Sequence, residues 1–320
     1  MAQAGERYAE IADPLQRQIL LQQYTHCPTG SRGVATIMQT AILGDDAHNQ
    51  KVAWSLLAKF ADPGTLDFLL NFYTLQVDGW LHREFYAALE SSLHFSHNAP
   101  DRERASLILE RCLAHKTDNS EFICLNGLAH LRPRHAEALL RQNLATNDEQ
   151  RVQQSLLILD HHPELHTHSL ELQALARRFS HRADIQAQCI RLLARKPELL
   201  AWVTLVQLHA AGIHPAAAAA LQQSIRRSDY FTKYQNRVWL TSGQTIGYQE
   251  PTSLSPPVLV LREQQVLLAL DADPRDYRAG SSPGACSPVT ATAETTWIQL
   301  LHPQWGQMWV SRQNVLPMPL

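Results

Sequence analysis

Apolar side chains recur at steps of three and four residues in four segments that align with one another, residues 84–93, 122–131, 151–160 and 184–193. This spacing places the apolar side chains on one face of a helix. A further apolar stretch of helical period precedes each segment, and a short polar break separates the two. The pattern therefore predicts a series of helix pairs.

The junctions between these pairs also repeat, because Pro133, Pro163 and Pro197 each follow the second helix of a pair. Proline cannot continue a helix but is favoured at the first position of the next one. One helix pair cannot bury its apolar stripe alone, so several pairs must stack to form a core. We therefore expect an α-solenoid, with a non-repetitive helical bundle as the alternative.

The best-defined pair spans residues 53–93. It contains the helical stretch AWSLLAKF, an Asp62-Pro63 turn, the stretch TLDFLLNFY, and a further helix that opens near Arg83. This layout resembles HEAT repeats, particularly the shorter bacterial kind, and the resemblance covers roughly residues 35–210. It implies a stacked helical surface that binds another protein. Tetratricopeptide repeats have a similar period, but the Gly-Tyr pair of their first helix and its small residues at fixed offsets are not found in these helical stretches.

Composition changes near residue 243. Residues 216–220 are five consecutive alanines and are followed by an aromatic cluster. We interpret this stretch as a cap on the last repeat, with a partner-binding helix as the alternative. The stretch 243–257 is rich in turn-forming residues. We predict a helical repeat domain at residues 1–245, a linker at 246–257 and a β domain at 258–320.

The final segment reads as short strands. Residues 258–261 and 266–270 predict a hairpin, followed after a long polar loop by strands at 295–301 and 308–311. The closing residues, with two Trp-containing strands around a Gly turn and a final Leu-Pro, resemble a bacterial SH3-like barrel. The predicted fold class is mainly α, an α-solenoid of stacked helix pairs followed by a small SH3-like β-barrel domain.

Composition and charge narrow the possible partners. The 320 residues are 45% hydrophobic and 18% charged, with a formal net charge of −2. This near-neutral charge argues against a broad binder of nucleic acid, whose domains are strongly basic. No apolar run approaches the roughly 18 residues that span a bilayer, and residues 1–8 lack signal-peptide features. The five cysteines are scattered without a CxxC pair, so we expect a cytoplasmic protein with reduced thiols and no membrane partner.

One stretch suggests a metal site. Residues 160–168 contain four histidines, and if Pro163 begins a helix, His162 and His166 share a face at zinc-ligand spacing. The alternative is chance clustering at an exposed junction, because the chain has 16 histidines.

The sequence gives little support for catalysis. Its Gly-x-Ser-x-Gly match, GSSPG at residues 280–284, lies in the long polar loop and not between an apolar strand and a helix, and the glycine pairs GSRG and GQTIG lack the Lys-Ser/Thr ending of a phosphate loop. We therefore expect no catalytic residues and no cofactor. The leading hypothesis is a non-enzymatic scaffold, adaptor or assembly factor of a bacterial multiprotein system, with Trp80, Arg83, Trp305 and Trp309 as candidate partner-binding residues.

A second hypothesis comes from the HEAT resemblance. Some HEAT-like solenoids are DNA glycosylases for alkylated bases, which use tryptophans and an aspartate on a basic concave face. Here that would involve Trp54, Trp80 and Trp202 with Arg83 and Arg191. The near-neutral net charge and the apolar surroundings of Trp54 and Trp202 weigh against it.

Overall fold

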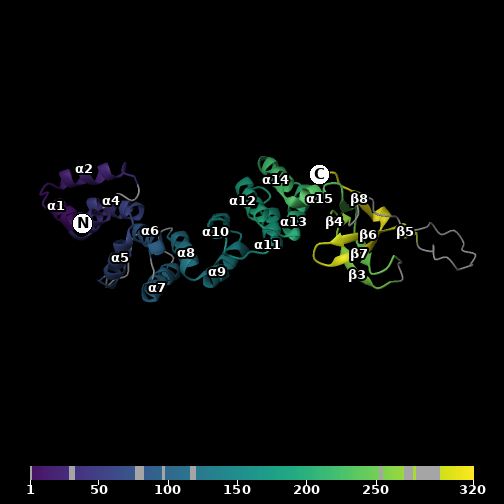
Figure 1. Cartoon of the computed structure of the whole chain (residues 1–320), viewed down its shortest axis with the longest axis horizontal. Coiled ribbons are helices and arrows are strands. Elements are labelled where there is room, and N and C mark those ends of the chain that lie inside the picture. Colours follow the sequence, from purple (N-terminus) through teal and green to yellow (C-terminus); the bar gives the residue numbers. More distant parts are fainter. Residues whose placement is uncertain are drawn as a thin grey trace, which may run out of the picture. The chain divides into compact units, whose positions relative to one another are not determined.

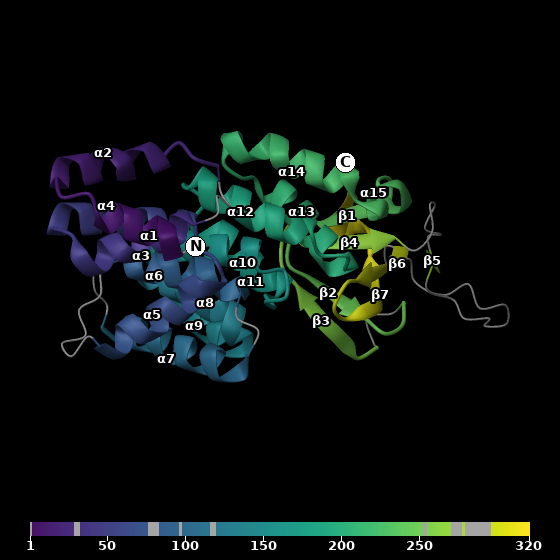
Figure 2. The same cartoon turned by 60° about the vertical axis from the view of Figure 1, so that its left-hand side comes forward.

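The computed structural model describes residues 2–28, 33–75, 83–95, 98–115, 120–251, 255–269, 277–278 and 296–320. The chain divides into two compact units, Met1–His166 and Thr167–Leu320. The described part of the first unit is helical, and the second unit combines helices with an antiparallel sheet (Figures 1 and 2). The domains predicted at 1–245 and 258–320 stay a prediction, because independent folding is not visible in a structure.

The first unit is a succession of short helices. Their bounds are α1 (Ala2–Ala9), α2 (Pro14–Tyr24), α3 (Val34–Gly44), α4 (Ala47–Lys59), α5 (Pro63–Leu75), α6 (Arg83–Ser92), the 3₁₀ turn η1 (Leu93–Phe95), α7 (Ala99–His115), α8 (Glu121–Leu131), α9 (Pro133–Ala145) and α10 (Glu149–His161). Three of the four aligned segments lie in α6, α8 and α10, so their predicted helices are confirmed.

Polar side chains and proline set where these helices begin. The carboxylates of Asp13, Asp46 and Asp148 accept hydrogen bonds from first-turn amides of α2, α4 and α10, amides that would otherwise lack partners. Pro133 stands at the start of α9, as its position predicts. Pro163 follows α10 but does not begin the next helix.

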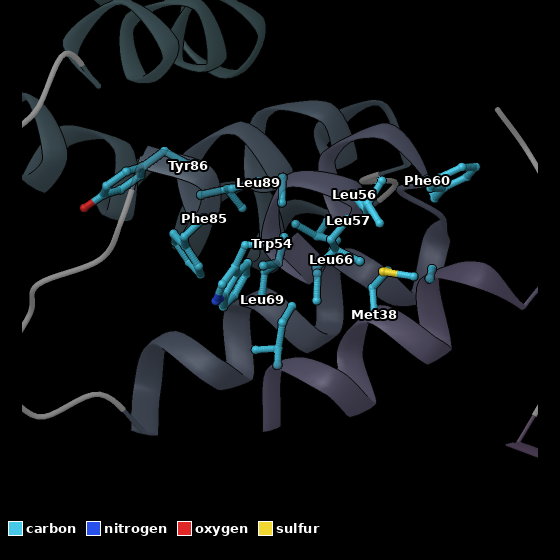
Figure 3. Close-up of a cluster of buried hydrophobic side chains, with 14 of the residues drawn as sticks. Met38, Trp54, Leu56, Leu57, Phe60, Leu66, Leu69, Phe85, Tyr86 and Leu89 are labelled. Atoms are coloured by element: carbon cyan, nitrogen blue, oxygen red, sulfur yellow. The ribbon is translucent and has the colours of Figure 1, made fainter. Parts of the chain in front are cut away.

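An aromatic cluster lies in the core of the first unit. The Trp54 ring contacts Phe72 and Phe85 edge-on, with ring centroids 5.2 and 5.7 Å apart. Around it lie the fully buried side chains of Leu57 and Leu69 (Figure 3). The apolar stripes of α4, α5 and α6 thus meet in one core, as the helical period predicts.

Two cysteines of the first unit form a disulfide. Cys112 on α7 and Cys124 on α8 are bonded through their sulfurs, with Cα atoms 6.3 Å apart, and both side chains are buried. The expectation of reduced thiols throughout is therefore wrong for this pair. Cys27 and Cys189 are free. Spacing alone did not reveal the pair, because the packing of α7 on α8 brings the two residues together. The cytoplasmic location stays a prediction.

The second unit opens with five helices, α11 (Ser169–Arg178), α12 (Ala183–Ala194), α13 (Leu199–Ala211), α14 (Pro215–Arg227) and α15 (Asp229–Tyr234). The fourth aligned segment lies in α12, and the polyalanine stretch lies in α14, so both predicted helices are confirmed. Pro197 precedes α13 by two residues and does not begin it. None of the helices described in either unit is long and apolar enough to cross a membrane.

After these helices the described residues form eight short strands: β1 (Val238–Thr241), β2 (Thr245–Tyr248), β3 (Pro257–Leu261), β4 (Val266–Ala269), β5 (Tyr277–Arg278), β6 (Thr296–His302), β7 (Gly306–Ser311) and β8 (Val315–Pro317). They form one sheet in the order β3-β2-β7-β6-β4-β1-β8, and β5 pairs with β6. In the described residues β3 and β8 end this order, so the sheet is not closed into the predicted barrel.

The strands of this sheet confirm part of the prediction and correct part of it. The hairpin of β6 and β7 is present, with Ile298 opposite Val310, and the 3₁₀ turn η2 (Arg312–Asn314) precedes β8. The hairpin predicted between β3 and β4 is wrong, because β3 pairs with β2 while β4 pairs with β1 and β6. The strands β1 and β2 lie in sequence interpreted as a cap and a linker.

The turn between β3 and β4 is held by β1 instead of by strand pairing. The Thr241 hydroxyl donates to the carbonyl of Arg262 and accepts from the amide of Gln265 at 2.8 Å. The backbone amide of Gln264 donates to the Thr241 carbonyl at 2.8 Å, and Gln264 has a left-handed backbone with φ of 57°. These bonds direct β3 and β4 to different neighbours.

Helix α13 is joined to the sheet through one amide side chain. Gln207 is buried; its Nε2 donates to the carbonyl of Gln264, and its Oε1 accepts from the amide of Val266 at 2.8 Å. A backbone donor and a backbone acceptor of the β3–β4 turn are thus satisfied by a helix. Helix and sheet therefore share a junction within the second unit.

A buried histidine orders the β6–β7 turn. The Nδ1 of His302 accepts from the amides of Gln304 and Trp305 at 3.2 and 3.3 Å, so it carries no proton. Its Nε2 lies 2.8 Å from the side-chain nitrogen of Gln265. Burial lowers the pKa of His302 to about 4, since desolvation disfavours the imidazolium ion.

This burial predicts a loss of stability in acid. Below the pKa of about 6.5 in the unfolded chain, His302 binds a proton in the unfolded chain. In the folded chain it binds this proton only near pH 4. Stability is therefore present above pH 6.5 and declines toward pH 4, by up to about 3 kcal/mol. Thermal unfolding at pH 7.5 and 4.5 checks this prediction. His302→Asn, which keeps a hydrogen-bond acceptor, should lose less stability between these two pH values than wild type does. The exposed control His26→Asn should behave like wild type; equal acid loss in all three would contradict the prediction.

Candidate functional site

A cleft of about 810 Å³ opens between α12 and α14 of the second unit. Figures 1 and 2 show these two helices side by side. One wall comes from residues between Ala187 and Pro197, and the other from residues between Ala220 and Tyr230. Because four of the lining residues are basic, we call it the basic cleft; they are Arg191, Arg195, Lys196 and Arg227.

Helix α12 and its C-cap residue each supply one of these cations. Ile185, Cys189 and Leu193 face the core, which leaves Arg191 and Arg195, one turn apart, on the exposed side. Near the start of the helix, Arg182 Nη2 lies 2.7 Å from Asp184 Oδ2. The hydrogen bond from Arg182 lowers the pKa of Asp184, so this carboxylate remains ionised.

Helix α14 carries the opposite wall. Pro215 occupies its first turn, and the ring Nδ1 of His214 accepts from the amide of Ala216 at 3.3 Å. Leu221 and Ile225 are buried against the unit, while Arg227 is exposed at the last turn. The alanines that favour a helix here have small side chains, and one of them, Ala220, lines the cleft.

Two lining residues in the loop between α12 and α13 are held by contacts with α15 and with the segment before α11. The Tyr230 hydroxyl donates to the carbonyl of Pro197 at 3.0 Å, and Lys196 Nζ donates to the carbonyl of Thr167 at 2.6 Å. Behind Tyr230 lies the buried indole of Trp202, whose Nε1 donates to the carbonyl of Ile225 at 3.2 Å. The wall is thus attached to the hydrophobic core.

Charge distinguishes this hollow from the rest of the chain. Four cations line it together with one carboxylate, Asp229, a formal excess of three positive charges on a chain whose net charge is −2. Arg191 and Arg195 also interact with groups of the protein itself. Such a cleft can attract anions and pair carboxylates with guanidinium groups.

The predicted metal pair, His162 and His166, lies where α10 ends. Residues 163–165 form a turn, so the assumed helix face does not exist. His162 Nδ1 lies 3.0 Å from Glu164 Oε1, and its Nε2 lies 3.1 Å from Asn126 Oδ1, so both ring nitrogens have oxygen partners. His130 packs edge-on against the His162 ring, and both burial and the neighbouring His162 lower the pKa of His130.

His166 is exposed beyond this turn. Among the residues described, no cluster of three or more His, Cys, Asp or Glu side chains could hold a metal ion. Metal binding by His162 and His166 stays a prediction.

The predicted partner-binding residues are dispersed. Arg83 is exposed at the first position of α6, and Trp80 lies outside the described residues. Trp305 is 58% exposed in the β6–β7 turn, and Trp309 lies on β7 opposite Tyr248 and Gln299. The structure does not bring the pair Arg83 and Trp305 together in one unit, and the role of all four stays a prediction.

The tryptophans of the glycosylase hypothesis are core residues where they are described. Trp54 is buried in the first unit and Trp202 in the second, as their positions in apolar runs predict. Neither indole is exposed for stacking on a base. Arg191, named under the same hypothesis, lines the basic cleft.

The residues that sequence reasoning missed are Arg195, Lys196 and Arg227. The spacing of Arg191 and Arg195 could have placed two cations on one face of α12. No sequence signal relates that face to Arg227. Comparisons with known proteins add no further guide, because no family model matches the chain and no curated protein is significantly similar to it.

Proposed function

We propose that this chain is a non-enzymatic scaffold that binds another protein, and that the basic cleft is a binding site of its second unit. The observation that carries the proposal is a cleft of about 810 Å³ with four cationic side chains on a chain of net charge −2. A local excess of charge opposed to the overall charge favours complementary partners and their orientation.

The proposal extends to the fold. We propose that the helix pairs are repeats of a HEAT-like α-solenoid, and that the C-terminal strands form an SH3-like module. The paired helices α5 to α12 and the final hairpin with its 3₁₀ turn support these assignments. Stacked helix pairs present extended surfaces that suit protein partners, which is how the architecture would serve an adaptor or assembly factor.

The test is recovery of partners by the full chain from the cells that make it. We compare wild type with Arg227→Glu, which reverses a charge in the cleft, and with Arg226→Glu, which reverses the neighbouring exposed charge outside it. Because both arginines lie in the last turn of α14, both changes alter the helix dipole interaction alike. We expect one protein to be retained by wild type and Arg226→Glu and depleted at least about tenfold by Arg227→Glu. Equal recovery by all three would refute the role of the cleft.

A further inference from the structure

We infer that the ligand of the basic cleft is an acidic peptide segment in which carboxylates alternate with small apolar side chains. The inference rests on the proposed function and names the chemistry of the partner.

The cations are of the type that binds carboxylates. Arg191, Arg195 and Arg227 are exposed on the two walls, and a planar guanidinium pairs with a carboxylate through two parallel hydrogen bonds. Lys196, in the loop between α12 and α13, adds a fourth charge, and its Nζ donates to the Thr167 carbonyl. Asp229 is the single opposing charge of the lining.

Spacing indicates how acidic groups would be arranged. Arg191 lies in the last turn of α12, and Arg195, four residues later, is the C-cap residue and keeps a helical backbone conformation. Side chains at this spacing are neighbours on one helix face, about 5–6 Å apart at Cβ. A bound helix with Asp or Glu at the same spacing, or an extended segment with acids at alternate positions, presents carboxylates at a comparable interval. A further acidic side chain of the peptide would pair with Arg227, which lies on the opposite wall of the cleft.

Part of the cleft lining consists of small and aliphatic side chains. Ala187, Ala194 and Ala220 line the cleft together with the buried side chain of Ile190. Methyl groups leave room for a main chain to approach and give small apolar side chains a surface to contact. Mixed charged and apolar lining therefore fits a peptide with alternating character better than a free inorganic anion, which gains nothing from the alanines.

Nucleic acid is the other polyanion that a basic cleft could attract. Its affinity comes mainly from releasing counterions along many phosphates, which requires an extended basic surface. Here four cations lie in one hollow, and the chain as a whole is slightly acidic. The observations favour a short acidic peptide, and the experiment below also measures the binding of nucleic acid.

The experiment is selection of a displayed random-peptide library on the full-length protein, with counter-selection on Arg227→Glu. We expect Asp and Glu to be enriched, and the selected peptides to bind Arg227→Glu at least about tenfold more weakly, while binding Arg226→Glu like wild type. Arg227→Gln, which only removes the charge, should fall between. Affinity should decrease as salt rises. Unchanged circular dichroism and thermal midpoints show that the variants are folded.

Three results would overturn the inference. They are enrichment of neutral or basic peptides, equal binding of acidic peptides to Arg227→Glu and wild type, and tighter Arg227-dependent binding of a single-stranded DNA oligonucleotide than of any selected peptide. Acidic peptides that need Arg227, without any protein recovered from cells, would support the cleft chemistry and count against the proposed function.

Discussion

Replacing Asp45 by asparagine is expected to destabilise the first unit by about 3 kcal/mol, because it leaves a partly buried cation without its partner. The Asp45 side chain is only 3% exposed and lies 2.6 Å from Arg17 Nη1 through its Oδ1. Its Oδ2 accepts from the Tyr8 hydroxyl. This carboxylate therefore connects α1 and α2 to the end of α3.

The same contacts fix the states of the two partners. Burial raises the pKa of Tyr8, and the hydrogen bond to Asp45 raises it further, so the phenol stays neutral and can donate. Arg17 also donates through Nε to the carbonyl of Ile11 at 2.5 Å. Asparagine keeps the shape of the side chain at position 45 but removes the charge, so packing changes little.

Urea unfolding of the full chain measures the effect, with Asp13→Asn as the matched control. Asp13 is an exposed N-cap of α2 in the same region, and asparagine caps a helix as well as aspartate does. The control should thus stay within about 0.5 kcal/mol of wild type. A loss at Asp45→Asn no larger than at Asp13→Asn would show that the buried ion pair contributes nothing.

Replacing Gln207 by leucine is the second large expected effect, a loss of about 3 kcal/mol in the second unit. Leucine has similar volume but removes the partner of the buried Val266 amide and of the part-buried Gln264 carbonyl, and a buried unsatisfied group costs about 1–3 kcal/mol. Because these groups belong to the β3–β4 turn, we expect amide hydrogen exchange to accelerate in β4 as well.

Gln222→Leu provides the comparison, because it makes the same replacement of glutamine by leucine at an exposed position of α14. Unfolding in urea gives the stability, and exchange followed by mass spectrometry gives the location. If β4 exchanges as in wild type while stability falls, the loss arises within the helices and the proposed junction is wrong.

The helices were predictable because each segment is long enough to show its period. The aligned segments contain ten residues, and their apolar positions become the buried faces of α6, α8, α10 and α12. Strands β1 and β2 have only four residues each. Two alternations are too few to separate a strand from a turn-rich linker.

Features that depend on distant partners were not predictable. The turn at Arg262 to Gln265 looks like a local hairpin, but side chains of Thr241 and Gln207 hold it. The disulfide of Cys112 likewise depends on how two helices pack. Half of the basic cleft follows from the spacing on α12, and Arg227 joins it only through the packing of α14.

The position of β1 in the sheet has a consequence for synthesis of the chain. Thr241 on β1 is opposite Val315 on β8, the last strand that the structure describes. The helices of the first unit contact neighbours close in sequence and can form while the ribosome is still translating the chain. The sheet cannot be completed until its last strand has emerged. A stalled or truncated product that ends before β8 would therefore expose one edge of β1 to other chains.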